Sequence, residues 1–239
     1  MGKLEGKTVL ITGASRGIGL AIANSLNGEG ARLILVARNR GPLSRAAKQL
    51  SGTAMAVAAD VSKPSAVKNL FAGVKKRFGR LDILINNAGV FTFKPFAKTT
   101  LEDWKRNIET NLTSIFLTTQ AALPLLKLSG GDVVNILSIS SRIPFPNCSA
   151  YTAAKHGALG LTNVLRRELR ADGIRVMAVF PGMTETQMKD EFDFPVRGED
   201  LLQPEDIAAA VLSALVQARR ATTEEIFLMP SAGPFSGEN

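Results

Sequence analysis

The stretch Thr12-Gly13-Ala14-Ser15-Arg16-Gly17-Ile18-Gly19 decides the fold. It follows a short apolar, β-rich run at 8–12 and precedes apolar residues at helical spacing. The three glycines permit a tight turn at Gly13, approach of a pyrophosphate to the backbone at Gly17, and close packing of helix on strand at Gly19. The free N–H groups at the start of the helix attract an anion. The stretch therefore predicts a strand–turn–helix unit that binds a dinucleotide.

Strand and helix signals alternate along the rest of the chain. Because the expected strands are continuous apolar runs separated by helices, they indicate a parallel sheet covered on both faces. We expect further strands at 33–37, 54–58, 81–85, 133–137, 174–180 and 225–229. We expect helices around 18–26, 43–50, 64–78 with Ser62 as N-cap, 101–128 with a kink at Pro124, 150–170, and from 204 onward.

Composition excludes several classes of protein. Hydrophobic residues make up 45% and charged residues 21% of the 239, which is typical of a globular protein and not of a disordered one. A single cysteine and a single histidine leave no basis for a disulfide framework or a metal centre. No apolar run reaches the roughly 18 residues of a membrane span, and the N-terminus lacks the apolar stretch of a signal peptide. We expect a soluble cytoplasmic protein with no metal and no membrane contact.

The net charge of +8 is unevenly distributed. Residues 1–100 carry 16 basic and 4 acidic residues, whereas residues 101–239 carry 13 basic and 17 acidic residues. The basic half is either a solvated face or a phosphate-binding region. No long Lys/Arg tract and no basic stripe interleaved with aromatic residues is present, so a nucleic-acid partner is not expected.

Polar residues follow two of the expected strands. Asp60, followed by Val61, ends the third strand and either accepts from an adenine amino group or caps the next helix. Asn86-Asn87-Ala88-Gly89 ends the fourth strand. The asparagines either tie adjacent strands together or border a cofactor.

A possible catalytic group lies at the end of the fifth strand. Tyr151 is the only tyrosine in the chain, and Lys155 follows four residues later on the same face of a helix. Ser138 ends the fifth strand. Open α/β sheets bind ligands at the carboxyl ends of their strands, so these three side chains are expected to meet there.

With these motifs in order, the chain resembles the short-chain dehydrogenase/reductase family over nearly all of its length. The resemblance rests on the glycine turn, Asp60, Asn86-Asn87-Ala88-Gly89, Asn111, Ser138, Tyr151-x-x-x-Lys155 and Pro181-Gly182. It implies one doubly wound Rossmann-type domain over 1–239, with about seven strands in an α/β/α sandwich, that carries both cofactor and substrate sites. Leu137 departs from the pattern, because many members have a second serine there.

The resemblance also implies a reaction and its residues. Hydride passes between a nicotinamide and a ketone or secondary alcohol, with Tyr151 as proton donor and Ser138 holding the carbonyl oxygen. Lys155 lowers the pKa of the phenol and holds the nicotinamide ribose, and Asn111 disturbs its helix and holds a relay water. The implied cofactor contacts are Gly13, Ser15, Arg16, Gly17, Ile18, Gly19, Asp60, Val61, Asn87, Ala88, Gly89, Tyr151, Lys155, Pro181, Gly182, Thr184 and Thr186.

Two arginines favour NADP(H) over NAD(H). An NAD-binding relative carries an acidic residue after the second strand, to accept from the adenosine ribose. Here Ala37 takes that position and Arg38 follows it, while Arg16 lies in the glycine turn. Both arginines are expected at the 2′-phosphate.

The substrate is left open. Phe93, Phe145 and Met183 are candidates to line its pocket, whereas Trp104 is expected to pack and no nucleophilic role is expected for Cys148. One alternative is a 3-oxoacyl-thioester reductase acting on acyl carrier protein. The acidic stretch 185–206 and the few basic residues near Ser129 and Asp172 argue against it. A second alternative is a protein that senses NADP(H) without turnover.

A homo-oligomer, most simply a tetramer, is also expected. The long helices at 101–128 and 150–170 are apolar on more faces than one sheet can cover. In relatives this helix pair forms a subunit interface.

Overall fold

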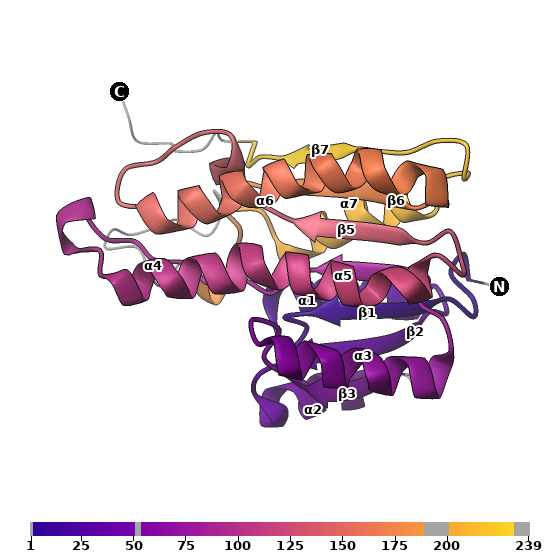
Figure 1. The fold of residues 1–239 in the computed structure, drawn as a ribbon. Helices are drawn as coiled ribbons and strands as arrows, with labels where there is room; N and C mark the ends of the chain where they lie inside the picture. The colour runs from indigo at the N-terminus through magenta and orange to yellow at the C-terminus, as the bar shows by residue number, and fades with distance from the viewer. Residues whose placement is uncertain (1, 51–53, 189–200, 232–239) are drawn as a thin grey trace.

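The computed structural model describes residues 2–50, 54–188 and 201–231. Within these ranges, seven parallel strands form one sheet in the order β3-β2-β1-β4-β5-β6-β7 (Figure 1). The strands are β1 (Thr8–Thr12), β2 (Arg32–Ala37), β3 (Ala54–Ala58), β4 (Ile83–Asn86), β5 (Asp132–Ile136), β6 (Arg175–Pro181) and β7 (Glu225–Leu228). The helices are α1 (Gly17–Gly28), α2 (Arg40–Gln49), α3 (Pro64–Phe78), α4 (Leu101–Ile108), α5 (Ser114–Leu126), α6 (Ser149–Glu168) and α7 (Pro204–Leu215).

Helices cover both faces of the sheet because successive strand residues point to opposite sides. In β1, Val9 and Ile11 pack in the core shared with α1, α2 and α7. Leu10, between them, packs in the core shared with α3 and α5, which lie in front of the sheet in Figure 1. All three residues are fully buried. The predicted doubly wound α/β fold with an α/β/α arrangement is confirmed.

Two expectations about helices are wrong. Lys63, not Ser62, is the N-cap of α3, because the Ser62 hydroxyl donates instead to the Asp60 carboxylate at 2.7 Å. The helix expected at 101–128 departs from α geometry in the π-helical segment Glu109–Thr113, between α4 and α5. Pro124 lies inside α5 near its end, where its missing N–H removes one i→i−4 hydrogen bond.

The edge where the strands begin is fixed by ion pairs. Arg175 at the start of β6 grips Asp132 at the start of β5 with two hydrogen bonds of 2.7 and 3.0 Å. Ser129 and Asp172 lie at this same edge, just before β5 and β6. They therefore lie opposite the edge where the ligand is expected, and the expectation that a carrier-bound substrate is disfavoured stays a prediction. None of the described helices is both long and apolar enough to cross a membrane.

Candidate active site

The glycine turn joins β1 to α1 at the carboxyl edge of the sheet. Gly13 and Gly17 have φ angles of +67° and +53°, in the left-handed region that side chains disfavour. Gly19 has a different reason to be glycine. A Cβ there would lie 2.4 Å from Nδ2 of Asn87 and 2.5 Å from the carbonyl oxygen of Gly13. The backbone of the turn therefore requires glycine at positions 13, 17 and 19.

Asn87 and Thr12 tie this turn to the end of β4. The Asn87 amide donates to the carbonyl oxygens of Thr12 (3.0 Å) and Gly13 (3.2 Å). In return, the Thr12 hydroxyl accepts from the backbone N–H groups of Asn87 and Ala88, both at 3.0 Å. Of the two roles left open for the asparagines, the structure assigns the tie between adjacent strands to Asn87.

The start of α1 fits a pyrophosphate. In the described chain the N-cap residue, Arg16, makes no side-chain hydrogen bond to the first turn, so the helix N–H groups there are left to an incoming anion. Ser15 and Ile18 are half-buried beside this turn, and Arg16 is exposed. The segment after β6 reaches the same place, since Cγ2 of Thr186 lies 3.3 Å from where a Cβ on Gly17 would be.

A cavity lies between the ends of β2 and β3 and the helix α4, which contributes Leu101, Glu102, Lys105 and Arg106 to its lining. It has a volume of about 580 Å³ and is lined in part by Arg38, Asp60 and Lys63. Asp60 accepts from the Ser62 N–H at 3.0 Å and from its hydroxyl. Burial opposes ionisation of Asp60, but these hydrogen bonds and the charges of Arg38 and Lys63 hold the pKa of its carboxyl below the usual value. Val61, next to it, is buried.

Ser138, Tyr151 and Lys155 come together at the end of β5. Ser138 lies close enough to Tyr151 to lower the pKa of its phenol, and the Ser138 oxygen accepts from the N–H of Ser140 at 3.1 Å. Nζ of Lys155 donates to the carbonyl oxygen of Ile136 at 3.0 Å and lies 5.6 Å from the centre of the Tyr151 ring. Tyr151 is 8% exposed and Lys155 is 5% exposed.

Burial dominates the ionisation of this group. It raises the pKa of Tyr151 to about 12, against the opposing effect of the Ser138 hydrogen bond, and lowers the pKa of Lys155 to about 8. The expected lowering of the phenol pKa by Lys155 together with an oxidised nicotinamide stays a prediction. The phenol is neutral at neutral pH and keeps a proton that it can donate.

Asn111 lies in the π-helical segment and is fully buried. The predicted disturbance of its helix is confirmed. Its carboxamide accepts from the N–H of Val90 at 3.1 Å and donates to the carbonyl oxygen of Val90 at 2.9 Å. Nδ2 also donates to Oδ1 of Asn107 at 3.3 Å. In this structure the side chain holds the loop that follows β4.

Further side chains of α4 hold the same loop, and sequence reasoning missed them. Asn107 and Arg106 both donate to the Thr92 hydroxyl, at 2.7 and 2.9 Å. Asp103 accepts from Nζ of Lys94 at 2.8 Å. Their spacing of three or four residues, continuing to Asn111, was the available signal, because it places them on one helix face.

A buried polar network joins β4, β5 and their covering helices; the sequence indicated Asn86 as a tie between strands but not its partners. Asn86 donates to Oδ1 of Asn135 at 2.9 Å and accepts from the Thr118 hydroxyl at 2.7 Å. Asn135 donates to the Thr162 hydroxyl on α6 at 2.9 Å. The signal was an asparagine within an apolar strand, where an unpaired amide would be costly. The network fixes α6, and with it Lys155, against β5.

Aromatic residues surround Tyr151. Phe91 meets its ring edge-on, with 4.9 Å between centroids and an interplanar angle of 89°. Cys148 is buried in the same cluster, against which Phe93 and Phe145 pack. Two of the three predicted pocket residues thus lie beside Tyr151. Met183, in the described stretch after β6, is half-buried but is not a member of this cluster.

The remaining predicted residues lie after β4 and β6. Gly89 packs against Asn111, whose Oδ1 would lie 3.0 Å from a Cβ there. Gly182 donates its N–H to Leu228 at 2.7 Å, and the Thr184 hydroxyl donates to the Gly182 carbonyl at 3.0 Å. Of the acidic stretch 185–206, residues 189–200 lie outside the described residues.

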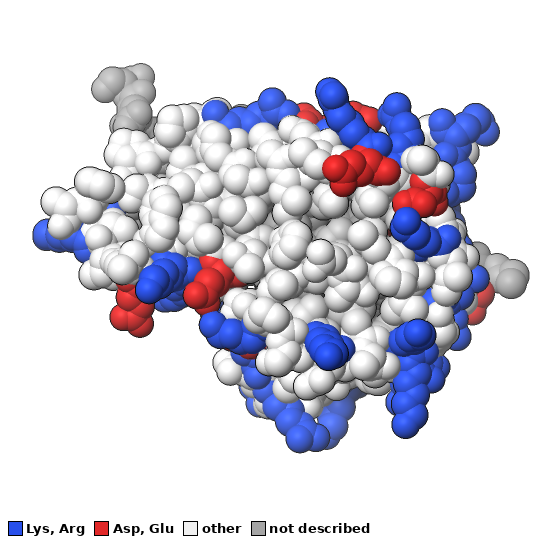
Figure 2. Space-filling view, in the orientation of Figure 1, with Lys and Arg blue, Asp and Glu red and all other residues white. Residues whose placement is uncertain are grey.

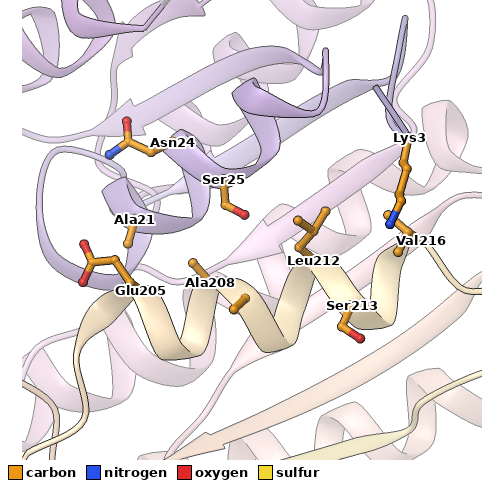
Figure 3. Close-up of a pocket in the computed structure, with 10 residues that line it drawn as sticks. Lys3, Ala21, Asn24, Ser25, Glu205, Ala208, Leu212, Ser213 and Val216 are labelled. Atoms are coloured by element: carbon orange, nitrogen blue, oxygen red, sulfur yellow. The ribbon is translucent and has the colours of Figure 1, made fainter. Parts of the chain in front are cut away.

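A second cavity, of about 500 Å³, lies between α1 and α7 (Figure 3). Small side chains line it, including Ala21 and Ser25 from α1 and Ala208 from α7. None of the candidate catalytic residues is among its lining residues. The chemistry therefore belongs to the carboxyl edge of the sheet.

The chain is similar to known proteins over nearly its whole length. A family model described as short chain dehydrogenase matches residues 7–194. An uncharacterized oxidoreductase of Staphylococcus epidermidis is 36% identical over 231 residues, which cover 96% of this chain and all of that protein. The crystal structure of a metagenomic short-chain oxidoreductase in complex with NADP matches with a TM-score of 0.85 and 33% identity, over 96% of this chain and 99% of the other.

Two further solved structures are similar. An alcohol dehydrogenase from the archaeon Thermococcus sibiricus, complexed with 5-hydroxy-NADP, has a TM-score of 0.88 and 31% identity over 94% of this chain and 97% of its own. A 3-ketoacyl-(acyl-carrier-protein) reductase from Brucella melitensis, complexed with NADH, has a TM-score of 0.89 and 31% identity over 95% of this chain and 98% of its own.

Proposed function

Because the chain belongs to the short-chain dehydrogenase family, we propose that it is an NADP(H)-dependent oxidoreductase that interconverts a ketone and a secondary alcohol. One observation carries the proposal: Ser138 lies close enough to Tyr151 to lower the pKa of its phenol, and Lys155 follows one helical turn later, at the edge that also carries the glycine turn. In this proposal a single domain holds both the cofactor and the substrate.

The proposed chemistry needs one proton and one hydride for each ketone. When bound, the nicotinamide supplies hydride to the carbonyl carbon. The Ser138 hydroxyl donates a hydrogen bond to the carbonyl oxygen and orients it. The Tyr151 phenol donates its proton to the same oxygen, which completes the secondary alcohol. Lys155 stabilises the resulting phenolate and holds the nicotinamide ribose, and Thr184 and Thr186 hold the carboxamide. We keep a water relay through Asn111 as part of this proposal.

Charge at the adenosine end supports NADP(H). Arg16 and Arg38 are exposed, and Ala37 ends β2 where a carboxylate would repel a 2′-phosphate. Two of the similar solved structures hold NADP or a derivative of it, whereas the Brucella reductase holds NADH.

One alternative keeps specific support. Similarity to the Brucella 3-ketoacyl-(acyl-carrier-protein) reductase favours a 3-oxoacyl thioester as substrate. A sensor of NADP(H) without turnover has less support, because such a protein would not need the proton donor Tyr151.

We also propose that the protein is a homo-oligomer, most simply a tetramer. Figure 2 shows the face over α5 and α6 almost free of charge, with charged side chains gathered around its rim. Phe116 of α5 and Val164 of α6 are 47% and 50% exposed. Trp104 of α4, which the sequence led us to expect to pack, is 41% exposed. A second copy of this face is the natural cover, since it is equally uncharged.

The variant Tyr151→Phe tests the proposed reaction. It removes the proton donor and little else, so ketone reduction should stop while the affinity for NADPH, read from the fluorescence of bound NADPH, stays nearly unchanged. If the variant keeps more than about a tenth of kcat, a difference below ~1.4 kcal/mol, Tyr151 is not the acid. Phe78→Leu, at the end of α3, is a control for a substitution outside the proposed site.

A further inference from the structure

The side chains around Tyr151 form one apolar and aromatic wall. Phe91 is edge-on to Tyr151, and Phe93 lies 6.3 Å from Phe91 with a tilt of 31°. Phe145 approaches from the loop after β5 and packs on the same cluster. Phe93 and Phe145 are half-buried, so part of each residue is exposed.

Two sets of hydrogen bonds hold this wall in place. The face of α4 described above fixes residues 90–94 through Thr92 and Val90. The N–H of Lys94 donates to the carbonyl oxygen of Asn147 at 2.7 Å, which joins the loop after β4 to the loop after β5. Asn147 adopts a φ of +63°, and it is the only non-glycine residue with a positive φ among those described. A strained residue at such a place is a mark of a functional site.

The wall carries no free charge. The sequences Val90-Phe91-Thr92-Phe93 and Ile143-Pro144-Phe145-Pro146-Asn147-Cys148 contain no charged residue. Lys94, which follows Phe93, forms a salt bridge of 2.8 Å with Asp103. Burial raises the pKa of the Cys148 thiol to about 11, so the thiol is neutral at neutral pH.

We propose that the substrate is an uncharged ketone with an aromatic ring attached to its carbonyl carbon; this inference rests on the proposed ketone reduction. A carbonyl oxygen that accepts from Ser138 and Tyr151 brings its substituents against the side chains packed on Tyr151. Aromatic rings gain from offset and edge-on contacts with other rings beyond the area that they bury. The open parts of Phe93 and Phe145 provide such contacts.

The same wall is unsuited to a carrier-bound thioester. The pantetheine arm of such a substrate ends in an anionic phosphodiester, and its thioester carbonyl needs a hydrogen-bond donor. Within residues 90–94 and 143–148 the one charged side chain is Lys94, and it is paired with Asp103. A carboxylate on the aromatic ring would meet the same obstacle.

Four carbonyl compounds of similar size test the proposal with NADPH. They are acetophenone, cyclohexyl methyl ketone, 4-acetylbenzoate and the acetoacetyl thioester of N-acetylcysteamine. We expect kcat/KM for acetophenone to exceed that for the cyclohexyl compound by about tenfold, the scale of aromatic contacts, and to exceed those for the other two by more. Equal or better reduction of the thioester or of the saturated ketone would overturn the aromatic assignment and leave the proposed reaction intact.

A variant and a binding measurement complete the test. Phe145→Leu should remove most of the preference for acetophenone over the cyclohexyl ketone, whereas Phe78→Leu should not change it. Saturation transfer in NMR from the protein to the acetophenone ring should be strong and should weaken in Phe145→Leu, without any turnover. An unchanged preference in Phe145→Leu would overturn the role of the wall. Binding of NADPH with reduction of none of the four compounds would instead overturn the proposed function.

Discussion

Asn111 grips Val90 by both of its backbone groups, through hydrogen bonds of 3.1 Å to the N–H and 2.9 Å to the carbonyl oxygen. Val90 precedes Phe91, whose ring packs edge-on against Tyr151. The buried carboxamide of Asn111 therefore helps to position the ring that packs against Tyr151, the proposed acid. This role is separate from the proposed water relay.

Asn111→Ala should lower both stability and turnover. It leaves the N–H and carbonyl of Val90 without their partners, which costs about 1–3 kcal/mol for each buried group left unsatisfied. Urea unfolding measures this loss, and ketone reduction by the folded variant measures the effect on kcat. Asn69→Ala, at an exposed position of α3, is the control. A variant as stable as wild type would show that the grip on Val90 contributes nothing to the fold.

The single tyrosine allows a direct titration of the proposed acid. Because burial raises the pKa of Tyr151 to about 12, tyrosinate absorbance of the folded protein should appear well above pH 10. In urea the same group should titrate near its ordinary value of ~10. Adding NADP⁺ should lower the pKa of the folded form, because the positive charge of the oxidised nicotinamide stabilises the phenolate. Titration of the folded protein at the unfolded value would contradict the burial argument.

The fold and most of the site were predictable because their signals are local. Apolar runs define the strands, and the glycine turn, Ser138, Tyr151 and Lys155 all lie next to strand or helix ends that the pattern locates. The hydrogen bonds that Asp103, Asn107 and Asn111 make to the loop after β4 were not predictable. Their partners lie in a loop whose position against α4 is set only by tertiary packing. The raised pKa of Tyr151 was not predictable for a similar reason, because the sequence does not show how deeply the phenol is buried.

Gly19→Ala should disrupt the glycine turn. The added Cβ would clash with the Asn87 amide and the Gly13 carbonyl, so the chain must shift where the pyrophosphate is proposed to bind. We expect a loss of stability on the order of 1–3 kcal/mol, as for overpacking, and weaker binding of NADPH. Gly73→Ala in α3 is the matched control, since a Cβ there meets nothing within 4 Å. That control should gain about 0.5–1 kcal/mol from helix propensity. Equal behaviour of the two variants would rule out the packing role of Gly19.

The uncharged face over α5 and α6 predicts self-association. Sedimentation velocity at micromolar concentration should give a mass above that of the 25.5 kDa monomer. Val164→Arg places a charge in the middle of this face and should shift the protein toward smaller species, because an unpaired charge is costly to bury. Arg170→Lys, an exposed change that keeps the charge at the end of α6, should not. A wild-type protein that sediments as a monomer would contradict the proposed interface.

The choice of cofactor is the last prediction. Wild type should prefer NADPH to NADH by about tenfold or more in kcat/KM, since hydrogen bonds to a charged group contribute about 1.5–3 kcal/mol each. Ala37→Asp combined with Arg38→Leu should reverse the preference. The new carboxylate at the end of β2 would accept from the ribose hydroxyls of NADH and repel a 2′-phosphate, and the loss of Arg38 removes an attraction. Arg16 remains at the N-cap of α1, so the reversal should be incomplete, and adding Arg16→Leu should extend it. Both arginines are exposed, so added salt should weaken the wild-type preference. Calorimetric titration of each cofactor provides a readout that does not depend on turnover. Equal affinity of the wild type for NADPH and NADH would remove Arg16 and Arg38 from the site and leave the proposed role of Tyr151 untouched.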